Sequence, residues 1–169
     1  MRKFFVAVLA VVSLSAIPVC AQTSSVKYQG EIDLGYSIGV GEWASSRLNI
    51  HTIQGMKVCD YFSTGIGLGL DYYTQEDGEV SFIPIYLNMK GYLPVSEKTA
   101  PYLSVDLGVG FGVSEAMSGL SGFYFTPAFG IKADKFKAQI GYNVQRIVYS
   151  DYDVSIGANA VQLKVGVMF

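Results

Sequence analysis

Large apolar side chains alternate with small or polar ones along almost the whole chain. From Val26 to Val40 every even-numbered position is apolar or glycine, and no odd-numbered position carries a large apolar side chain. A period of two is typical of a β-strand with one apolar and one polar face. The alternation returns seven more times, which predicts eight strands and no helix after the first 21 residues. The predicted strands cover residues 26–40, 47–58, 61–74, 80–93, 102–114, 122–133, 136–149 and 158–169.

Turn signals rich in Gly, Asp, Ser and Pro separate these strands. Eight strands in simple succession, each long enough to cross a bilayer when tilted, predict an antiparallel up-and-down meander. Closing the meander into a barrel removes both edge strands. The predicted fold is therefore all-β, an eight-stranded antiparallel up-and-down β-barrel. Pro84 and Pro127 fall inside predicted strands, where each requires a bulge or a lost ladder bond.

The first 21 residues have the three parts of a secretory signal. Arg2 and Lys3 precede an apolar run at residues 4–12, and a Val-Cys-Ala boundary follows at residues 19–21. The apolar run is too short to span a hydrocarbon layer of about 30 Å as a helix. We therefore expect residues 1–21 to be a signal peptide and residues 22–169 to form one barrel domain.

Charge and composition indicate what surrounds this barrel. Without Arg2 and Lys3, 10 of the 12 basic residues remain against 14 acidic ones. Charged residues make up 15% of the chain, below the roughly 25% of an average soluble domain. The acidic balance argues against a nucleic-acid-binding surface, and the low charge content favours β-structure that meets something other than water.

The two strand faces differ in a way that indicates which one points inward. The polar face is crowded with glycines, whereas the apolar face carries bulky Leu, Ile, Val and Phe. An eight-stranded barrel has little room inside, so missing side chains are useful there. We therefore expect a transmembrane barrel, apolar outside and polar inside, rather than a soluble ligand-carrying barrel. The glycines in question are Gly65, Gly67, Gly69, Gly108, Gly110, Gly112, Gly130, Gly141 and Gly166.

Aromatic residues on the apolar face fall near the strand ends. Two aromatic girdles that bracket an apolar band about 25 Å tall are typical of membrane barrels. One predicted girdle contains Tyr28, Phe62, Phe136 and Phe169. The other contains Tyr36, Tyr72, Phe111, Phe123 and Phe125.

These features resemble the small OmpA/OmpX-type outer-membrane β-barrels over the whole mature chain. The resemblance rests on the glycine-alternating strand Phe62–Tyr72, its repeat at Leu103–Val113, and the terminal Phe169. It implies a transmembrane barrel in the outer membrane with both termini in the periplasm. It also implies two partners: outer-membrane lipid, and the barrel-insertion machinery, which such proteins engage through a C-terminal strand that here ends at Phe169.

Ionisable side chains of inward parity are the candidate chemistry of the lumen. An isolated buried ion costs several kcal/mol, so these charges must find partners. We expect Lys90 to lie near enough to Asp106 to pair, and Glu31 to meet Lys164 where the first and last strands join. Such pairs fill the lumen, and the alternative is a narrow ion path opened by their rearrangement. The ion-pair candidates are Glu31, Asp33, Asp71, Lys90, Asp106, Lys132 and Lys164, and Arg47, Lys57 and Lys137 share their inward parity.

His51 is the only histidine. The resemblance implies that lipid-modifying barrels of this kind place a catalytic histidine with serine or acidic partners at the membrane rim. Here His51 has inward parity, and no His-x-Ser motif accompanies it. One histidine and one mature cysteine, Cys59, do not supply the ligands of a zinc site. We therefore expect no catalytic, cofactor or metal site.

The loops are the other candidate surface. The segments 41–46 and 150–156 carry aromatic and acidic residues, including Trp43 and Tyr152, which suit an unknown surface ligand or contact with lipid headgroups. The sequence thus predicts an integral outer-membrane protein with a structural or surface-interaction role. A narrow pore for ions or small solutes and a lipid-modifying enzyme are the alternatives.

Overall fold

The computed structural model describes residues 26–41, 45–73, 80–113, 120–149 and 154–169. The predicted signal peptide and the loop residues Trp43 and Tyr152 lie outside these ranges. Among the described residues, no helix is long and apolar enough to cross a membrane. The strands are β1 (Lys27–Gly39), β2 (Arg47–Cys59), β3 (Phe62–Tyr73), β4 (Val80–Tyr92), β5 (Thr99–Gly112), β6 (Ser121–Ala133), β7 (Phe136–Tyr149), β8 (Val154–Gly157) and β9 (Ala160–Met168).

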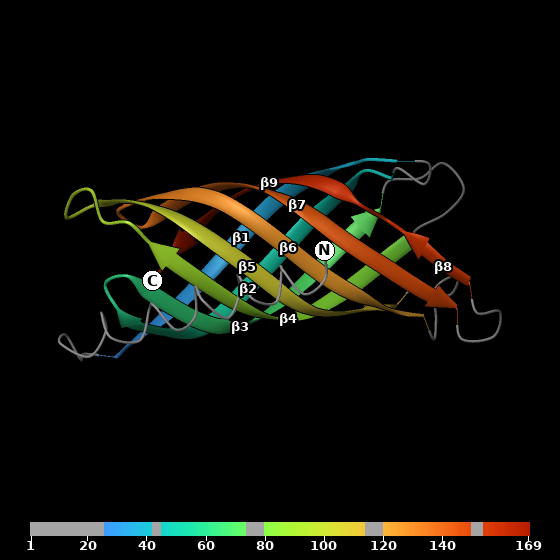
Figure 1. Ribbon diagram of the computed structural model, residues 1–169, viewed down its shortest axis with the longest axis horizontal. Helices are drawn as coiled ribbons and strands as arrows, with labels where there is room; N and C mark the ends of the chain where they lie inside the picture. The colour runs from blue at the N-terminus through green and yellow to red at the C-terminus, as the bar shows by residue number, and fades with distance from the viewer. Residues whose placement is uncertain (1–25, 42–44, 74–79, 114–119, 150–153) are drawn as a thin grey trace, which may run out of the picture.

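Eight long strands close into a barrel in which every pairing is antiparallel (Figure 1). Consecutive strands from β1 to β7 are neighbours, and β9 pairs with both β7 and β1 to close the circle. The predicted all-β, eight-stranded up-and-down topology is therefore confirmed. Closure satisfies the backbone groups that an open sheet would expose at its two edges.

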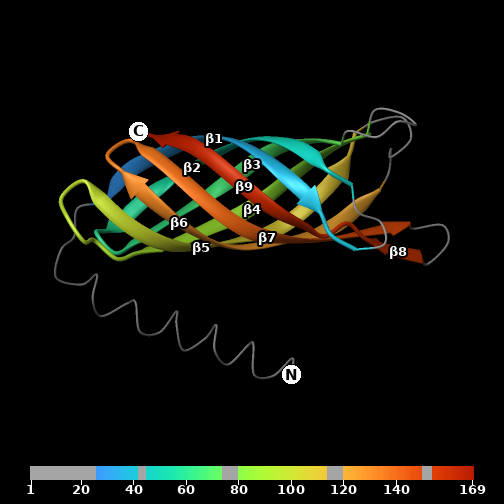
Figure 2. The ribbon, with the colours of Figure 1, turned by 90° about the horizontal axis from the view of Figure 1, so that it is seen from above.

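The last barrel strand differs from the prediction, which treated residues 150–156 as a loop. Both β8 and β9 pair with β7, and the register is the same on either side of Ala158 and Asn159. They are therefore one interrupted strand. Only β9 also reaches β1, so β8 has β7 as its one partner among the described strands, while β6 stays paired with β7 as far as Val148 (Figure 2).

The two ends of the barrel carry different connections. The turn end is formed by the short links at residues 60–61, 93–98 and 134–135, and the opposite end, which we call the loop end, is where β1, β3, β5 and β7 end. The first and last strands meet at the turn end, where Gly30 and Phe169 exchange two backbone hydrogen bonds of 2.8 and 2.9 Å.

The two prolines interrupt the ladder without a bulge. Pro84 pairs with β5 and Pro127 pairs with β5 from the other side. Toward β3 and β7, respectively, two residue pairs are missing around each proline, and the register is unchanged beyond the gap. Proline has no N–H to donate, so each strand loses ladder bonds on one side only.

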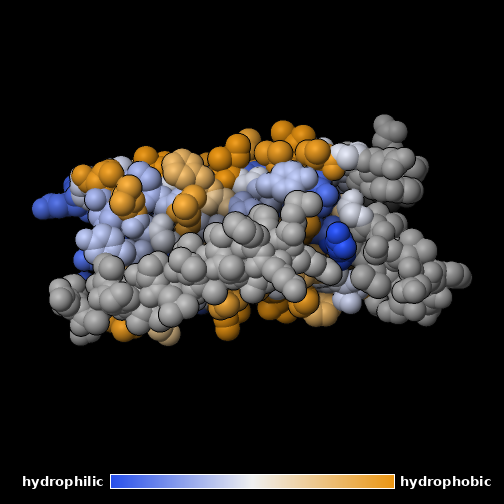
Figure 3. Space-filling view, viewed as in Figure 1, coloured by the Kyte–Doolittle hydropathy of each residue, from blue (hydrophilic) through white to orange (hydrophobic). Residues whose placement is uncertain are grey.

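Apolar side chains cover the outside of the barrel and ionic ones fill the inside. The exposed fractions of Leu68, Leu107 and Val109 are 48, 40 and 45%. Those of Glu31 and Asp106 are 1 and 2%. Figure 3 shows apolar residues spread along the visible part of the wall. The predicted inversion, apolar outside and charged inside, is confirmed.

The glycines of the inward face make room for large rings from neighbouring strands. A methyl group on Gly69 would lie 2.5 Å from the His51 ring, and one on Gly67 would lie 2.2 Å from the Tyr86 ring. Distances this short are incompatible with any side chain in the present packing. The glycine-alternating strand β3 is therefore the wall against which the central rings of the lumen pack.

Candidate functional site: the polar lumen

A four-residue ion cluster occupies the lumen toward the turn end; we call it the Glu31 cluster (Glu31, Asp33, Lys90 and Lys137). The Lys90 ammonium on β4 donates to both Glu31 carboxylate oxygens, at 2.8 and 2.7 Å. Lys137 on β7 also binds Glu31 and lies 2.8 Å from the Asp33 carboxylate. All four side chains are buried. Strand β1 supplies both carboxylates because residues two apart share a strand face.

A second cluster lies toward the loop end around Asp71 on β3. Asp71 accepts hydrogen bonds from Asn49 and from His51 Nε2, the latter at 2.9 Å, and its other oxygen is 3.7 Å from Arg47 Nε. Arg47 donates in turn to the Asn143 side chain across the lumen. Arg47, fully buried, is therefore held by partners on β3 and β7 at once.

His51 connects this second cluster to the middle of the lumen. Its Nδ1 lies 2.9 Å from the Tyr86 hydroxyl and 3.1 Å from Lys164 Nζ, while its Nε2 faces Asp71. Asp71 can only accept, and the Lys164 ammonium can only donate. The hydrogen-bond network therefore assigns the proton to Nε2 and leaves Nδ1 as the acceptor of a neutral imidazole.

Two predicted ion pairs are wrong. Lys90 does not bind Asp106 directly, because Asn88 lies between them: its Nδ2 donates to Asp106, and its Oδ1 accepts from Lys90 at 2.9 Å. Glu31 does not meet Lys164, since it is bound by the two lysines of its own cluster. The long lysine side chains cross the lumen to Glu31 instead of binding the adjacent strand. The alternation of residues along a strand shows only which face a side chain is on, and not which residue it contacts across the lumen.

The charged residues at the turn end are also corrected. Lys132 is half-buried and forms none of the ion pairs found among the described residues, because it lies at the barrel mouth, one residue from the end of β6. Lys57 instead binds Asp60 in the turn after β2, at 2.7 Å. That hydrogen bond and the nearby ammonium charge hold the pKa of Asp60 below its ordinary value.

The fully buried charges balance. With a neutral His51, four carboxylates face four cations, so the described lumen has no net charge. Arg47 and Lys137, for which the sequence indicated only inward parity, complete this balance. Six of the eight groups are joined in ion pairs, whereas Asp106 is held by Asn88 and Lys164 by His51. The eight groups are Glu31, Asp33, Asp71, Asp106, Arg47, Lys90, Lys137 and Lys164.

In the part of the chain that the structure describes, no group of three or more His, Cys, Asp or Glu side chains is placed to hold a metal ion. His51 uses both ring nitrogens within the lumen, and its side chain is buried. The described lumen is therefore occupied by paired and hydrogen-bonded side chains.

The aromatic residues predicted for the girdles all lie on the outer face. The Phe169 ring is 6.4 Å from that of Tyr28 at the turn end, and the rings of Phe123 and Phe125 stack at 6.3 Å. Phe62, Tyr72 and Phe125 are half-buried. The exposed members are Tyr28, Tyr36, Phe111, Phe123, Phe136 and Phe169.

Comparison with known proteins identifies the fold class. No family model and no curated protein matches the sequence. The structure is similar to the crystal structure of Neisserial surface protein A (NspA), with a TM-score of 0.68 and 10% identity over 86% of this chain and 98% of that one. For the outer membrane enzyme PagL the TM-score is 0.57 at 10% identity, over 79% of this chain and 97% of that one.

The N-terminal β-barrel domain of Pseudomonas aeruginosa OprF is a third similar structure, with a TM-score of 0.52 and 15% identity over 86% of this chain and all of that domain. At these identities the likeness shows the fold and does not assign an activity. The chain has the fold of the small eight-stranded outer-membrane β-barrels.

Proposed function

We propose that this protein is an integral outer-membrane barrel with a filled, non-conducting lumen, and that its role is structural or interactive at the cell surface. The turn end, with both termini, then faces the periplasm, and the loop end faces the outside. The balanced network of eight buried charges carries this proposal, because moving one of these groups aside to open a path would leave its partners buried without a counter-charge.

The outer wall supports the membrane part of the proposal. Exposed Leu, Ile, Val and Phe side chains cover it, and lipid is the solvent in which such a surface is stable. We assign Tyr28 and Phe169 to an aromatic girdle at the periplasmic interface, and Tyr36 and Phe111 to the opposite one. The C-terminal strand β9, which leads to Phe169, is the segment we expect the insertion machinery to recognise.

The ion clusters weigh against conduction. A path for ions through the Glu31 cluster requires Lys90 or Lys137 to leave its carboxylate. Breaking a buried ion pair costs about 3–5 kcal/mol, so the open form would have a population below about 1%. The structure therefore favours a plug over a narrow pore.

The position of His51 weighs against catalysis on lipids. A lipid substrate would approach along the outer wall, whereas His51 lies inside and its ring nitrogens face Asp71, Tyr86 and Lys164. We therefore propose a non-catalytic protein that needs no cofactor. Lipid A from cells with and without the protein should give identical mass spectra, and a protein-dependent change in acylation would refute this part of the proposal.

Single-channel recording in planar bilayers tests the plug. We expect no conductance steps from the folded protein, which is verified beforehand by different gel migration of boiled and unboiled samples. Steady steps that change in Lys90→Met, but not in the turn variant Asp60→Asn, would instead establish a pore through the lumen. Identical migration of boiled and unboiled protein would contradict the closed, stable barrel itself.

A further inference from the structure

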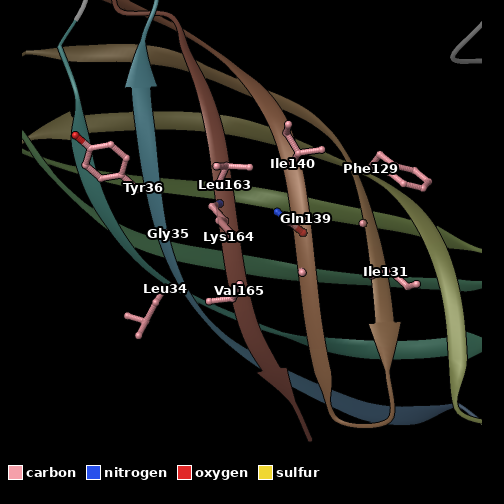
Figure 4. A pocket seen from close by; sticks show the side chains of 12 residues that line it. Leu34, Gly35, Tyr36, Phe129, Ile131, Gln139, Ile140, Leu163, Lys164 and Val165 are labelled. Atoms are coloured by element: carbon pink, nitrogen blue, oxygen red, sulfur yellow. The ribbon is translucent and has the colours of Figure 1, made fainter.

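A shallow groove of about 670 Å³ crosses four neighbouring strands on the outer wall (Figure 4). Two rows of apolar side chains border it, because residues paired across antiparallel strands lie side by side on one face. One row runs from Tyr36 on β1 to Phe129 on β6, through β9 and β7. The other runs parallel to it, from Leu34 to Ile131. We call this feature the wall groove.

The floor of the wall groove is backbone. Its row consists of Gly35, Lys164, Gln139 and Gly130, in which the two polar side chains point into the lumen and the glycines have none. Ala138 lies in the border row that starts at Leu34, where every other member is Leu, Val or Ile. Because the Ala138 side chain is a single methyl group, it projects less from the wall than its neighbours in the row, and the groove is open on that side.

The dimensions suit one hydrocarbon chain. Strands lie about 4.8 Å apart, so four strands give a length of roughly 15–20 Å, and border rows two residues apart are separated by about 7 Å. That width is too small for an α-helix, which is about 10–12 Å across with its side chains. Except for the Tyr36 hydroxyl, the border side chains offer no polar atom.

A second copy of the barrel fits this surface poorly. A symmetric dimer would place the same patch of both copies face to face, and two grooves in that position enclose a void instead of packing. Voids lose the contacts that stabilise an interface. A flexible chain that lies within the groove avoids this cost.

The direction of the groove, and the charges where it comes nearest the turn end, indicate which kind of lipid provides the hydrocarbon chain. On β1 the groove lies mid-strand, at Leu34, whereas on β6 it reaches Ile131, two residues before the strand ends. Lys135 is exposed in the turn that follows. The Asp134 amide there donates to the Lys98 carbonyl at 2.7 Å, which brings a second exposed lysine to the same corner. The exposed Asp134 and Glu97 stand next to these lysines, so the corner carries charges of both signs.

From this geometry we infer that the wall groove binds one acyl chain of a glycerophospholipid from the leaflet at the turn end, with the lipid phosphate near Lys135 and Lys98. The glycerol end lies at the β6–β7 turn, and the chain rises obliquely toward β1. This inference rests on the membrane location given in the proposed function.

Native mass spectrometry of the folded barrel tests the site. The protein is extracted in mild detergent from bilayers of phosphatidylethanolamine and phosphatidylglycerol, and we expect one tightly retained phospholipid. Ala138→Phe fills the low point of the border and should reduce retention by about tenfold, which corresponds to about 1.4 kcal/mol. Val109→Phe, an exposed apolar position on β5, is the matched control and should retain lipid as the unaltered protein does. Lys135→Gln should reduce retention less, by a few-fold.

Several outcomes would overturn the inference. Equal retention in Ala138→Phe and Val109→Phe, or no retained lipid on a heat-modifiable barrel, removes the site and leaves the proposed function intact. A cross-linked dimer that disappears in Ala138→Phe would assign the groove to a second copy. Protein that does not enter bilayers at all would overturn the proposed function and this inference together.

Discussion

The substitution Glu31→Gln perturbs the lumen at the carboxylate that binds two lysines. Glutamine keeps the size and an acceptor oxygen but removes the negative charge, so the lumen gains one unbalanced positive charge. Lys137 retains the Asp33 carboxylate at 2.8 Å, whereas Lys90 retains only neutral acceptors, the new amide oxygen and the Asn88 side-chain oxygen at 2.9 Å. Lys90 is therefore the ion left without a counter-charge.

The expected loss in the free energy of unfolding follows from the counter-charges that the two lysines keep. Removing one partner of a buried ion pair destabilises a protein by about 3–5 kcal/mol. Because one of the two lysines keeps a carboxylate, we expect the lower part of this range, about 3 kcal/mol. Adding Lys90→Met removes the stranded ammonium and restores a neutral lumen. The double variant should then recover about 1–2 kcal/mol, within the usual coupling of neighbouring groups.

Urea unfolding in lipid vesicles measures these differences. The folded fraction is read from the unboiled gel band and, independently, from aromatic fluorescence. Asp60→Asn is the control, because it removes an ion pair of similar length from an exposed turn and should cost at most about 1 kcal/mol. The reasoning is refuted if Glu31→Gln costs no more than this control, or if the double variant is less stable than Glu31→Gln alone.

Two further substitutions use the same unfolding assay. Gly69→Ala places a methyl group 2.5 Å from the His51 ring and should cost about 1–3 kcal/mol, whereas Gly91→Ala, with no atom within 4 Å of the new methyl, should change stability by less than about 1 kcal/mol; equal effects would contradict the crowding of the lumen. Leu107→Arg, in the middle of β5, should cost about 2–4 kcal/mol in a bilayer, and Leu93→Arg, just past the end of β4, about 0–1 kcal/mol. Equal costs for the two arginines would place the apolar band elsewhere on the wall.

Much of the fold is encoded locally. The period-two pattern identified all eight barrel strands to within a few residues, because alternation depends only on neighbours in the chain. The same parity assigned Glu31, Asp71 and Lys164 to the inside and Leu68 to the outside. Crowding of the interior was also readable, since glycines recur on one face of β3.

The alternation along each strand does not determine which inward side chains contact one another; closure of the barrel does. The tilt and stagger of a closed barrel set which inward side chains reach one another across the axis, and these are properties of all strands together. For this reason Lys90 binds Glu31, 59 residues away, with Asn88 between it and Asp106. The extension of the last strand through β8 likewise depends on pairing with β7.

The wall groove shows the same division. Each border residue is recognisable from the sequence as outward-facing, yet the groove exists only because registers across β6, β7, β9 and β1 align two rows and leave Ala138 low between larger neighbours. The sequence by itself determined which side of each strand meets lipid. Only the assembled sheet decided which side chains stand next to one another, because that depends on hydrogen-bond register between strands distant in the chain.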